Sequence, residues 1–245
     1  MLAVTVCAAP PSRAAEGGFV PGPVGSAAIR AATLPPPGAY LFGFSFAGRP
    51  LDFRDSAGVH TPLTLDGSTA GVSLGLGHVF AGEVWGGRVG MSVAGSYGQV
   101  CLRATDLAPV GLNTPVAFPN LAATWVSPPL LGDGTEFSAR AFYSMHGRNA
   151  DTGYRAGDMV VVDWAVSERI GRVQLGPAGS FARQVGPDRQ DGMRGPTTNV
   201  TSLGGVIAMD LPEAGMFLSL KALRDVSAEW RLRQHRIGLR IGVRL

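Results

Sequence analysis

The sequence predicts an all-β protein, an antiparallel transmembrane β-barrel of about ten strands. Three observations support this class. Apolar residues recur at every second position in one segment after another, which is the period of a strand with one apolar face. The opposite face of these segments consists mainly of Gly, Ser and Ala with occasional Arg, which suits a crowded barrel interior better than a water-exposed sheet. The connections alternate between long and short, as in outer-membrane barrels.

Composition narrows the alternatives. The chain has 245 residues, of which 45% are hydrophobic and only 16% charged, and this excludes a disordered chain. Glycine and proline are frequent, with 35 and 18 residues, but no Gly-X-Y period indicates collagen. After the N-terminal segment, no apolar run reaches the roughly 18 residues that a membrane-spanning helix needs. A membrane protein of this composition would therefore cross the bilayer with strands.

The N-terminal region predicts export. Met1 to Ala9 is small and apolar, and Ser12-Arg13-Ala14 fits a signal cleavage site with small outer residues. We therefore expect a signal-peptide-like segment at 1–14, a Pro/Gly-rich periplasmic leader at 15–38 and a single β-barrel domain at 39–245. Cys101 is then the only cysteine of the mature chain, and the four histidines lie far apart. No disulfide, metal site or cofactor is predicted.

The first strand begins at Tyr40, where aromatic residues alternate with smaller ones up to Ala47. Its aromatic side would be the apolar face, which a membrane barrel turns toward lipid. Eight further segments alternate in the same way, and a weaker candidate lies at Leu121 to Val126; the eight are Val72–Phe80, Arg88–Tyr97, Glu136–Tyr143, Met159–Val166, Val173–Phe181, Leu203–Met209, Met216–Lys221 and Arg236–Leu245. Ten strands result, or twelve if Gln99 to Pro119 contains another hairpin.

The alternation fits two structures equally well: a soluble periplasmic ligand-binding barrel that buries its apolar face, and a membrane barrel that exposes it to lipid. The connections favour the membrane barrel. Long ones are expected at Gly48–Thr69, Gln99–Pro119, Gly147–Gly157, Val185–Thr197 and Leu223–Gln234, and short ones at Ala81–Val84, Ser127–Gly134, Ser167–Gly171 and Leu211–Gly215. Short turns are periplasmic in such barrels, so both ends of the barrel domain would lie in the periplasm.

The positions of tryptophans and charged residues also fit a membrane barrel. Trp85, Trp125 and Trp164 are expected beside short turns, where they would form an interfacial aromatic belt. Polar residues on the other face of the strands would face the lumen: Arg88, Glu136, Arg140, Asp163, Gln174, Lys221, Arg236, Arg240 and Arg244. Pairing of opposite charges across a narrow barrel could alternatively fill and rigidify it without any transport.

Several motifs together are similar to those of a known family. They are Leu34-Pro35-Pro36-Pro37-Gly38 followed by Tyr40, the group Asn149, Thr152, Tyr154, Gly157 and Asp158, and Leu175-Gly176 with Gly179, Phe181, Gln184 and Asp188. The sequence resembles the transporter-like outer-membrane proteins named phenol meta-pathway degradation protein, or SphA-like, over residues 31–245. The resemblance implies a membrane β-barrel associated with the handling of hydrophobic or aromatic compounds.

Other functions have weaker support. Asp151, Asp158, Asp163 and His146 could suggest acid–base or metal chemistry, but nothing in the sequence indicates a shared partner, so no enzyme is predicted. No glycine-rich phosphate loop is present. The polar segment with Gln184, Asp188, Arg189 and Asp191 could bind an ion or a lipopolysaccharide phosphate, although a solvated loop explains it better. Seven of the 21 basic residues lie between Lys221 and Arg244, but they alternate with apolar residues as a strand does, so nucleic acid is not an expected partner.

These observations predict a passive outer-membrane channel of a Gram-negative bacterium for small hydrophobic or aromatic compounds. A structural or adhesive barrel with a filled lumen is the first alternative, and a soluble periplasmic ligand-binding barrel is the second. The expected partners are outer-membrane lipid, the barrel-assembly machinery and a small hydrophobic or aromatic ligand. The leader, Pro21 to Gly38, is expected at or inside the periplasmic mouth, where it could plug the lumen.

Overall fold

The computed structural model of this protein describes most of the chain after its N-terminal region. The described residues are 37–55, 57–60, 66–84, 87–103, 116–117, 119–127, 130–149, 153–190, 193–195 and 197–245. The predicted signal segment and nearly all of the leader, as well as Trp85, lie outside these residues. No helix in the described part is long and apolar enough to cross a membrane.

The described chain forms one curled antiparallel sheet. Ten of its strands are long: β1 (Gly38–Arg54), β2 (Asp66–Val84), β3 (Gly87–Arg103), β5 (Asn120–Ser127), β6 (Gly134–His146), β7 (Met159–Ile170), β8 (Val173–Gln184), β11 (Asn199–Leu211), β12 (Met216–Glu229) and β13 (Arg231–Arg244). The short β4 (Val116–Ala117) pairs with β6, and β9 (Arg189–Gln190) with β10 (Met193–Arg194) form a separate small ribbon. The described residues thus contain the ten long strands that the sequence predicts.

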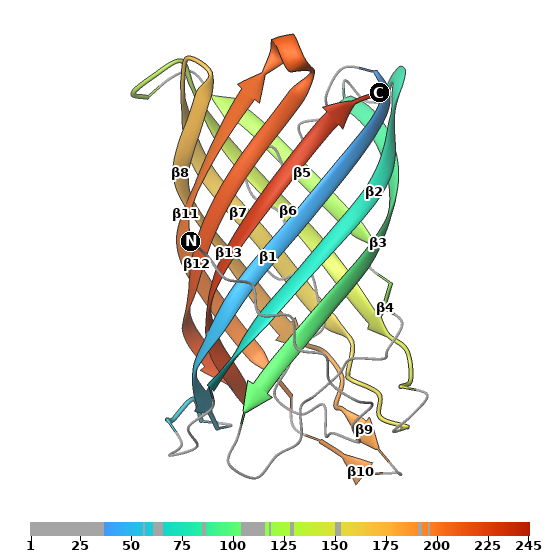
Figure 1. Cartoon of the computed structure of the whole chain (residues 1–245), viewed down its shortest axis with the longest axis vertical. Helices are drawn as coiled ribbons and strands as arrows, with labels where there is room; N and C mark the ends of the chain where they lie inside the picture. The colour runs from blue at the N-terminus through green and yellow to red at the C-terminus, as the bar shows by residue number, and fades with distance from the viewer. Residues whose placement is uncertain are drawn as a thin grey trace.

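The strand order is β3-β2-β1-β13-β12-β11-β8-β7-β6, and both β4 and β5 pair with β6. In Figure 1 the strands tilt across a barrel-shaped sheet. The C-terminus, the start of β1 and the one-turn helix η1 (Pro212–Ala214) lie at the upper end, and β9 and β10 lie beyond the lower end. We call these the turn end and the loop end. The first and last strands pair along most of their length.

The outer face of the sheet is apolar. In antiparallel ladders, directly paired residues point to the same side of the sheet. Ile237, Leu239 and Ile241 alternate with the inward-facing positions of β13, and Ile237 is 52% exposed although the side chain is aliphatic. Leu74 on β2 and Leu121 on β5 are also exposed, at 62% and 82%. An exposed apolar band on successive strands is the outer surface that a lipid-embedded barrel requires.

The aromatic side of β1 corrects one expectation. Tyr40, Phe42, Phe44 and Phe46 are paired with Arg244, Gly242, Arg240 and Gly238, all on the inner face of β13. The aromatic rings therefore point into the barrel, whereas Leu41, Gly43, Ser45 and Ala47 are on the lipid side. Alternation shows that these two sets lie on opposite faces, but only the pairing with the arginine side of β13 determines which face is inside.

The connection between β12 and β13 corrects a second expectation. Leu223 to Gln234 is not a long loop: β12 continues to Glu229, β13 starts at Arg231, and Trp230 makes the turn with a positive φ of 48°. The turns at Gly171 and Gly215 lie where the sequence predicts them, each with φ of 60°. The sequence allows another hairpin between Gln99 and Pro119. In the structure, residues 99–103 belong to β3, and residues 104–115 lie outside the described residues.

Much of the interior between β6 and β12 is filled. One buried apolar cluster contains Phe142, Met159, Val161, Ala182, Val200 and Ala228, and a second contains Ala165, Ala178, Val206, Ala208 and Leu223, with Phe217 packed against it. Alanine is the commonest residue of the second cluster, where the concave face of a narrow barrel offers little space. Asp163 lies on β7 between Val161 of the first cluster and Ala165 of the second, and its side chain is fully buried.

Candidate functional site

Charged side chains from four strands meet in the barrel interior. Arg140 on β6 is paired with Asp163 on β7 in the ladder, and the two interact electrostatically. Lys221 on β12 interacts with the same Asp163 and is repelled by Arg236 and Arg240 on β13. Because β8 and β11 separate β7 from β12 in the sheet, these interactions bridge the interior. Arg140, Asp163, Lys221, Arg236 and Arg240 all belong to the predicted lumen-facing set.

A second group holds Arg236 in place. Its Nη2 donates to Asp225 Oδ1 at 2.6 Å and also to Ser202 Oγ, while Asp225 accepts the backbone N–H of Gln234 at 3.0 Å. Asp225 and Ser202 are fully buried. The sequence analysis missed Asp225, although its position two residues after Leu223 on the inner side of β12 is a signal that could have found it. Arg236 and Asp225 therefore form a structural ion pair, because each charge neutralises the other inside the barrel.

The remaining predicted lumen residues are divided between the interior and the barrel rim. Glu136 accepts a hydrogen bond from Gln174 Nε2 at 2.9 Å, and both side chains are buried toward the turn end. Arg244 is exposed at the turn end, and its Nη2 donates to Pro37 O at 3.4 Å. Arg88 lies in β3, in a part of the strand whose side chains are not described. Lumen-facing roles for these residues stay predictions.

The tryptophans of β5 and β7 lie at different heights along the barrel. Trp125 is near the turn end of β5, 64% exposed, and its ring stacks on that of Phe137 at a centroid distance of 5.3 Å. Trp164 is in the middle of β7, stacked on Phe181 and covering Gly179, where an added Cβ would lie 2.6 Å from the indole. Trp164 is therefore not beside a short turn. The interfacial belt stays a prediction for Trp125.

The aromatic row of β1 faces this charged interior. Each inward aromatic residue has a small residue beside it on one or both neighbouring strands: Phe46 lies between Gly71 and Gly238, and Phe42 between Gly75 and Gly242. The contacts are close, since a Cβ added to Gly71 would collide with the ring of Phe46. Phe44 and Phe46 stack with centroids 6.0 Å apart. These glycines allow a continuous aromatic surface on the barrel wall.

The residues of the family motifs form a clamp between two loops at the loop end. Asp188 accepts hydrogen bonds from Tyr154 Oη, from the backbone N–H of Gly157 at 2.9 Å and from Gln184 Nε2 at 2.6 Å. A side chain on Gly157 would collide with the carbonyl of Gly186, so glycine is required there. The interpretation of Gln184 and Asp188 as part of a solvated loop is therefore wrong, because both are committed to internal hydrogen bonds.

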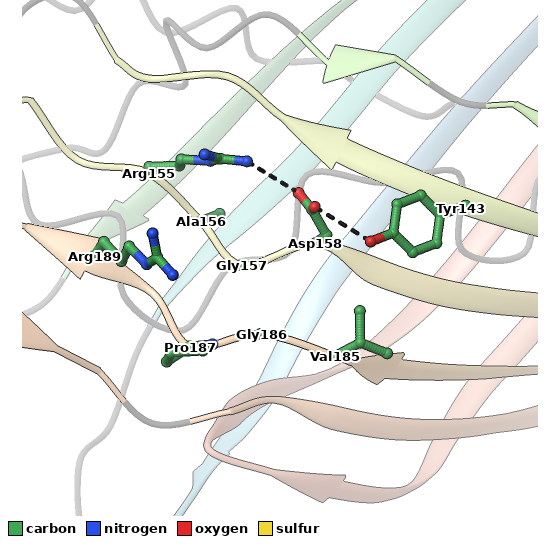
Figure 2. Close-up of a pocket in the computed structure, with 9 residues that line it drawn as sticks. All are labelled: Tyr143, Arg155, Ala156, Gly157, Asp158, Val185, Gly186, Pro187 and Arg189. Carbon is green, nitrogen blue, oxygen red and sulfur yellow. Dashed lines mark hydrogen bonds and ion pairs between the residues drawn. The ribbon is translucent and has the colours of Figure 1, made fainter.

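Beside this clamp is a pocket of about 150 Å³, in which Arg155 and Tyr143 both approach Asp158 (Figure 2). The Arg155 Nη2 to Asp158 Oδ1 distance is 3.7 Å, and Tyr143 Oη donates to Oδ2 at 3.3 Å. Asp158 Oδ1 also accepts the backbone N–H of His146, and His146 Nδ1 contacts the Gly157 carbonyl at 2.9 Å. Asp158 and His146 thus stabilise the loop between β6 and β7 through internal hydrogen bonds. Among the described residues, no cluster of His, Cys, Asp or Glu could hold a metal ion.

An antiparallel barrel with an apolar outer face and a charged, aromatic interior defines the class of outer-membrane β-barrel proteins. Comparison with protein families gives a match over residues 102–241 to the family described as "Putative MetA-pathway of phenol degradation". The chain belongs to this family, so the resemblance in its motifs is confirmed. A comparison with curated proteins gives no match.

One solved structure supports the fold. The crystal structure of the COG4313 outer membrane channel from Pseudomonas putida F1 is similar to this chain with a TM-score of 0.59 and 13% sequence identity, over 86% of this chain and 97% of that chain. The crystal structure of OccK7 (OpdD) from Pseudomonas aeruginosa covers 84% of this chain and 98% of its own, at 11% identity, but its TM-score of 0.21 carries no structural argument. The predicted fold, an antiparallel β-barrel, is confirmed.

Proposed function

We propose that this protein is an outer-membrane channel through which small aromatic and other hydrophobic compounds diffuse into a Gram-negative cell. The observation that carries the proposal is the inward-facing aromatic row of β1, Tyr40, Phe42, Phe44 and Phe46. Aromatic rings on a barrel wall offer stacking contacts to a passing ring, each worth about 0.5–1.5 kcal/mol. The apolar outer surface, the similarity of the fold to an outer membrane channel and the description of the family all support this proposal.

The filled part of the interior favours a second candidate, a structural barrel without transport. Two apolar clusters and the buried Arg236–Asp225 pair occupy the inner face between β6 and β13. Such packing stabilises a barrel whether or not anything passes through it. The two candidates differ in one measurable property, the rate at which a small aromatic compound enters the cell.

The test uses a strain that lacks the gene and is complemented with the wild-type protein or with a variant. Uptake of labelled toluene or phenol at limiting concentration is expected to fall in the deletion strain and to recover with the wild-type protein. The double variant Phe44→Ala, Phe46→Ala should lower the rate by at least about fivefold, because two stacking contacts worth together about 1–3 kcal/mol are lost. Phe137→Ala, which removes an outward-facing ring, is the matched control. Uptake that does not change on deletion would favour the structural barrel.

A further inference from the structure

A small open space lies on the inner wall of the barrel near the turn end. Gly242 occupies an inward position of β13, where it is paired with Phe42 of β1 on one side and with Phe217 of β12 on the other. A Cβ added to Gly242 would meet no atom of the described residues within 4 Å. By contrast, a Cβ added to Gly238, two inward positions away, would lie 2.9 Å from the ring of Phe44. We call the space above Gly242 the niche.

Aromatic residues stand on both sides of the niche. Phe42 and Phe217 are the two cross-strand neighbours of Gly242, and two strand-to-strand steps separate their backbones by about 10 Å. Stacked or edge-on aromatic rings have centroids about 4.5–7 Å apart, so one further ring placed between these two can contact both. Glycine at position 242 leaves the room that such a ring needs, and Phe217 is held in place by packing against a buried apolar cluster.

The charge beside the niche is positive. Arg240 and Arg244 are the next inward residues of β13 on either side of Gly242, at the spacing of alternate strand positions. Within the described residues, Arg240 forms no hydrogen bond or ion pair, and its electrostatic neighbours include the cations Arg140 and Lys221. A cation inside a barrel with no carboxylate at contact distance is poorly compensated, and an anion that reaches it gains a strong charge-assisted interaction.

We propose that the niche binds a small aromatic anion, with the ring between Phe42 and Phe217 and a carboxylate or similar anionic group at Arg240. An inorganic anion would make no use of the two aromatic walls, and a neutral ring would leave Arg240 uncompensated. The inference rests on the proposed channel function and adds a preferred class to its substrates, compounds that combine one aromatic ring with one negative charge. It places their binding site close to the turn end, near the start of β1.

The test compares two probes of nearly equal shape, benzoate and benzyl alcohol, with purified full-length protein in detergent at pH 7, where a carboxylic acid is ionised. Binding is measured by calorimetry or by ligand-observed NMR. We expect benzoate to bind about tenfold more tightly than benzyl alcohol, the effect of one charge-assisted hydrogen bond. Arg240→Gln should remove this preference and leave benzyl alcohol binding unchanged. Gly242→Leu should weaken both probes by about tenfold, because its side chain fills the niche.

Two control variants change the same residue types elsewhere. Arg172→Gln alters an exposed arginine at the β7–β8 turn, and Gly82→Leu alters an exposed glycine with equally open surroundings. Both should bind like the wild-type protein. Heat-modifiable gel migration verifies folding, and if Gly242→Leu fails to fold, Arg240→Gln decides the question. Equal affinity for the two probes, or an unaltered preference in Arg240→Gln, would overturn the inference.

The outcomes also separate this inference from the proposed channel function. Uptake of toluene or phenol through a protein that shows no preference for benzoate would refute the aromatic-anion site and leave the channel intact. A benzoate preference that depends on Arg240, in a protein whose deletion changes no uptake, would support the site and refute the channel.

Discussion

Neighbouring residues of β13 experience opposite environments, because a strand turns successive side chains to opposite faces. Ile241 lies on the apolar outer face and Arg240 on the inner face beside Phe44. We expect Ile241→Arg to impair assembly or stability more than Arg240→Ile, since an arginine facing lipid is destabilising, by about 2–4 kcal/mol at the bilayer midplane and less toward the interface, while lumen positions mainly tune selectivity. The amount of heat-modifiable protein in the membrane fraction measures this difference. Equal tolerance of the two changes would show that the faces are assigned incorrectly.

Asp52, near the loop end of β1 and beyond the apolar band, makes the stability of the rim sensitive to acid. It accepts hydrogen bonds from Arg233 Nε at 2.7 Å and Nη2 at 2.6 Å and is also paired with Arg54. Burial acts to raise the pKa of Asp52, but the hydrogen bonds and charges of Arg233 and Arg54 outweigh it and hold the pKa below the ordinary 3.8. The carboxylate therefore contributes stability above that pH, and the contribution is lost as the pH falls through the lowered pKa.

We expect Asp52→Asn to destabilise the folded protein at pH 7 by about 1–3 kcal/mol, the cost of removing a charged hydrogen-bond acceptor. The variant should also lose less stability than the wild-type protein when the pH is lowered from 5 to about 3. Thermal unfolding in detergent, followed by the shift in gel migration, measures both effects. Identical acid sensitivity of the two proteins would show that Asp52 does not carry the pH dependence.

At the scale of elements, the loop clamp explains why the family motifs have their spacing. Tyr154 and Gly157 belong to the β6–β7 loop, whereas Gln184 and Asp188 belong to the end of β8 and the loop after it, and hydrogen bonds to Asp188 join the two segments. These four motif residues thus stabilise the loop end. Their residue types alone favoured a solvated loop over ion binding, because a carboxylate in a loop has the same sequence signature whether it is solvated or internally bonded.

We expect Asp188→Ala to open the clamp, since three donors lose their acceptor at a total cost of about 2–4 kcal/mol. Limited proteolysis should then cut within residues 147–158 or 185–198, while the barrel keeps its heat-modifiable migration. Asp133→Ala, which removes an acceptor for the Gly171 N–H at the opposite end, is the matched control and should leave the loop-end cleavage rate unchanged. Resistance of Asp188→Ala to the protease would mean that other contacts hold these loops.

At the scale of the whole molecule, the barrel should be found in the outer membrane. Its outer face is apolar on successive strands, and its fold is similar to that of an outer membrane channel. Fractionation of cells that express the protein should recover it with the outer membrane, and its gel migration should shift on heating. Recovery in the soluble periplasmic fraction would favour the alternative of a soluble ligand-binding barrel.

The sequence by itself determined the elements that depend on local pattern. Alternation identified the ten long strands, including the weak one at Leu121 to Val126, and glycine and proline identified the turns at Gly171 and Leu211 to Gly215. The clean alternation of β13 was enough to separate its apolar face from its arginine face. These features follow from the two-residue period of a strand and from the backbone preferences of turn residues, both of which act over a few positions.

Only the tertiary structure decided how the faces of different strands combine. Tyr40 to Phe46 are as apolar as a lipid-facing row, and they line the interior because the register pairs them with Arg240, Arg244 and two glycines of β13, nearly 200 residues away in the sequence. The niche above Gly242 and the Asp188 clamp likewise join residues from separate strands and loops. Such features depend on long-range register, and a local pattern carries no information about which distant residue lies opposite.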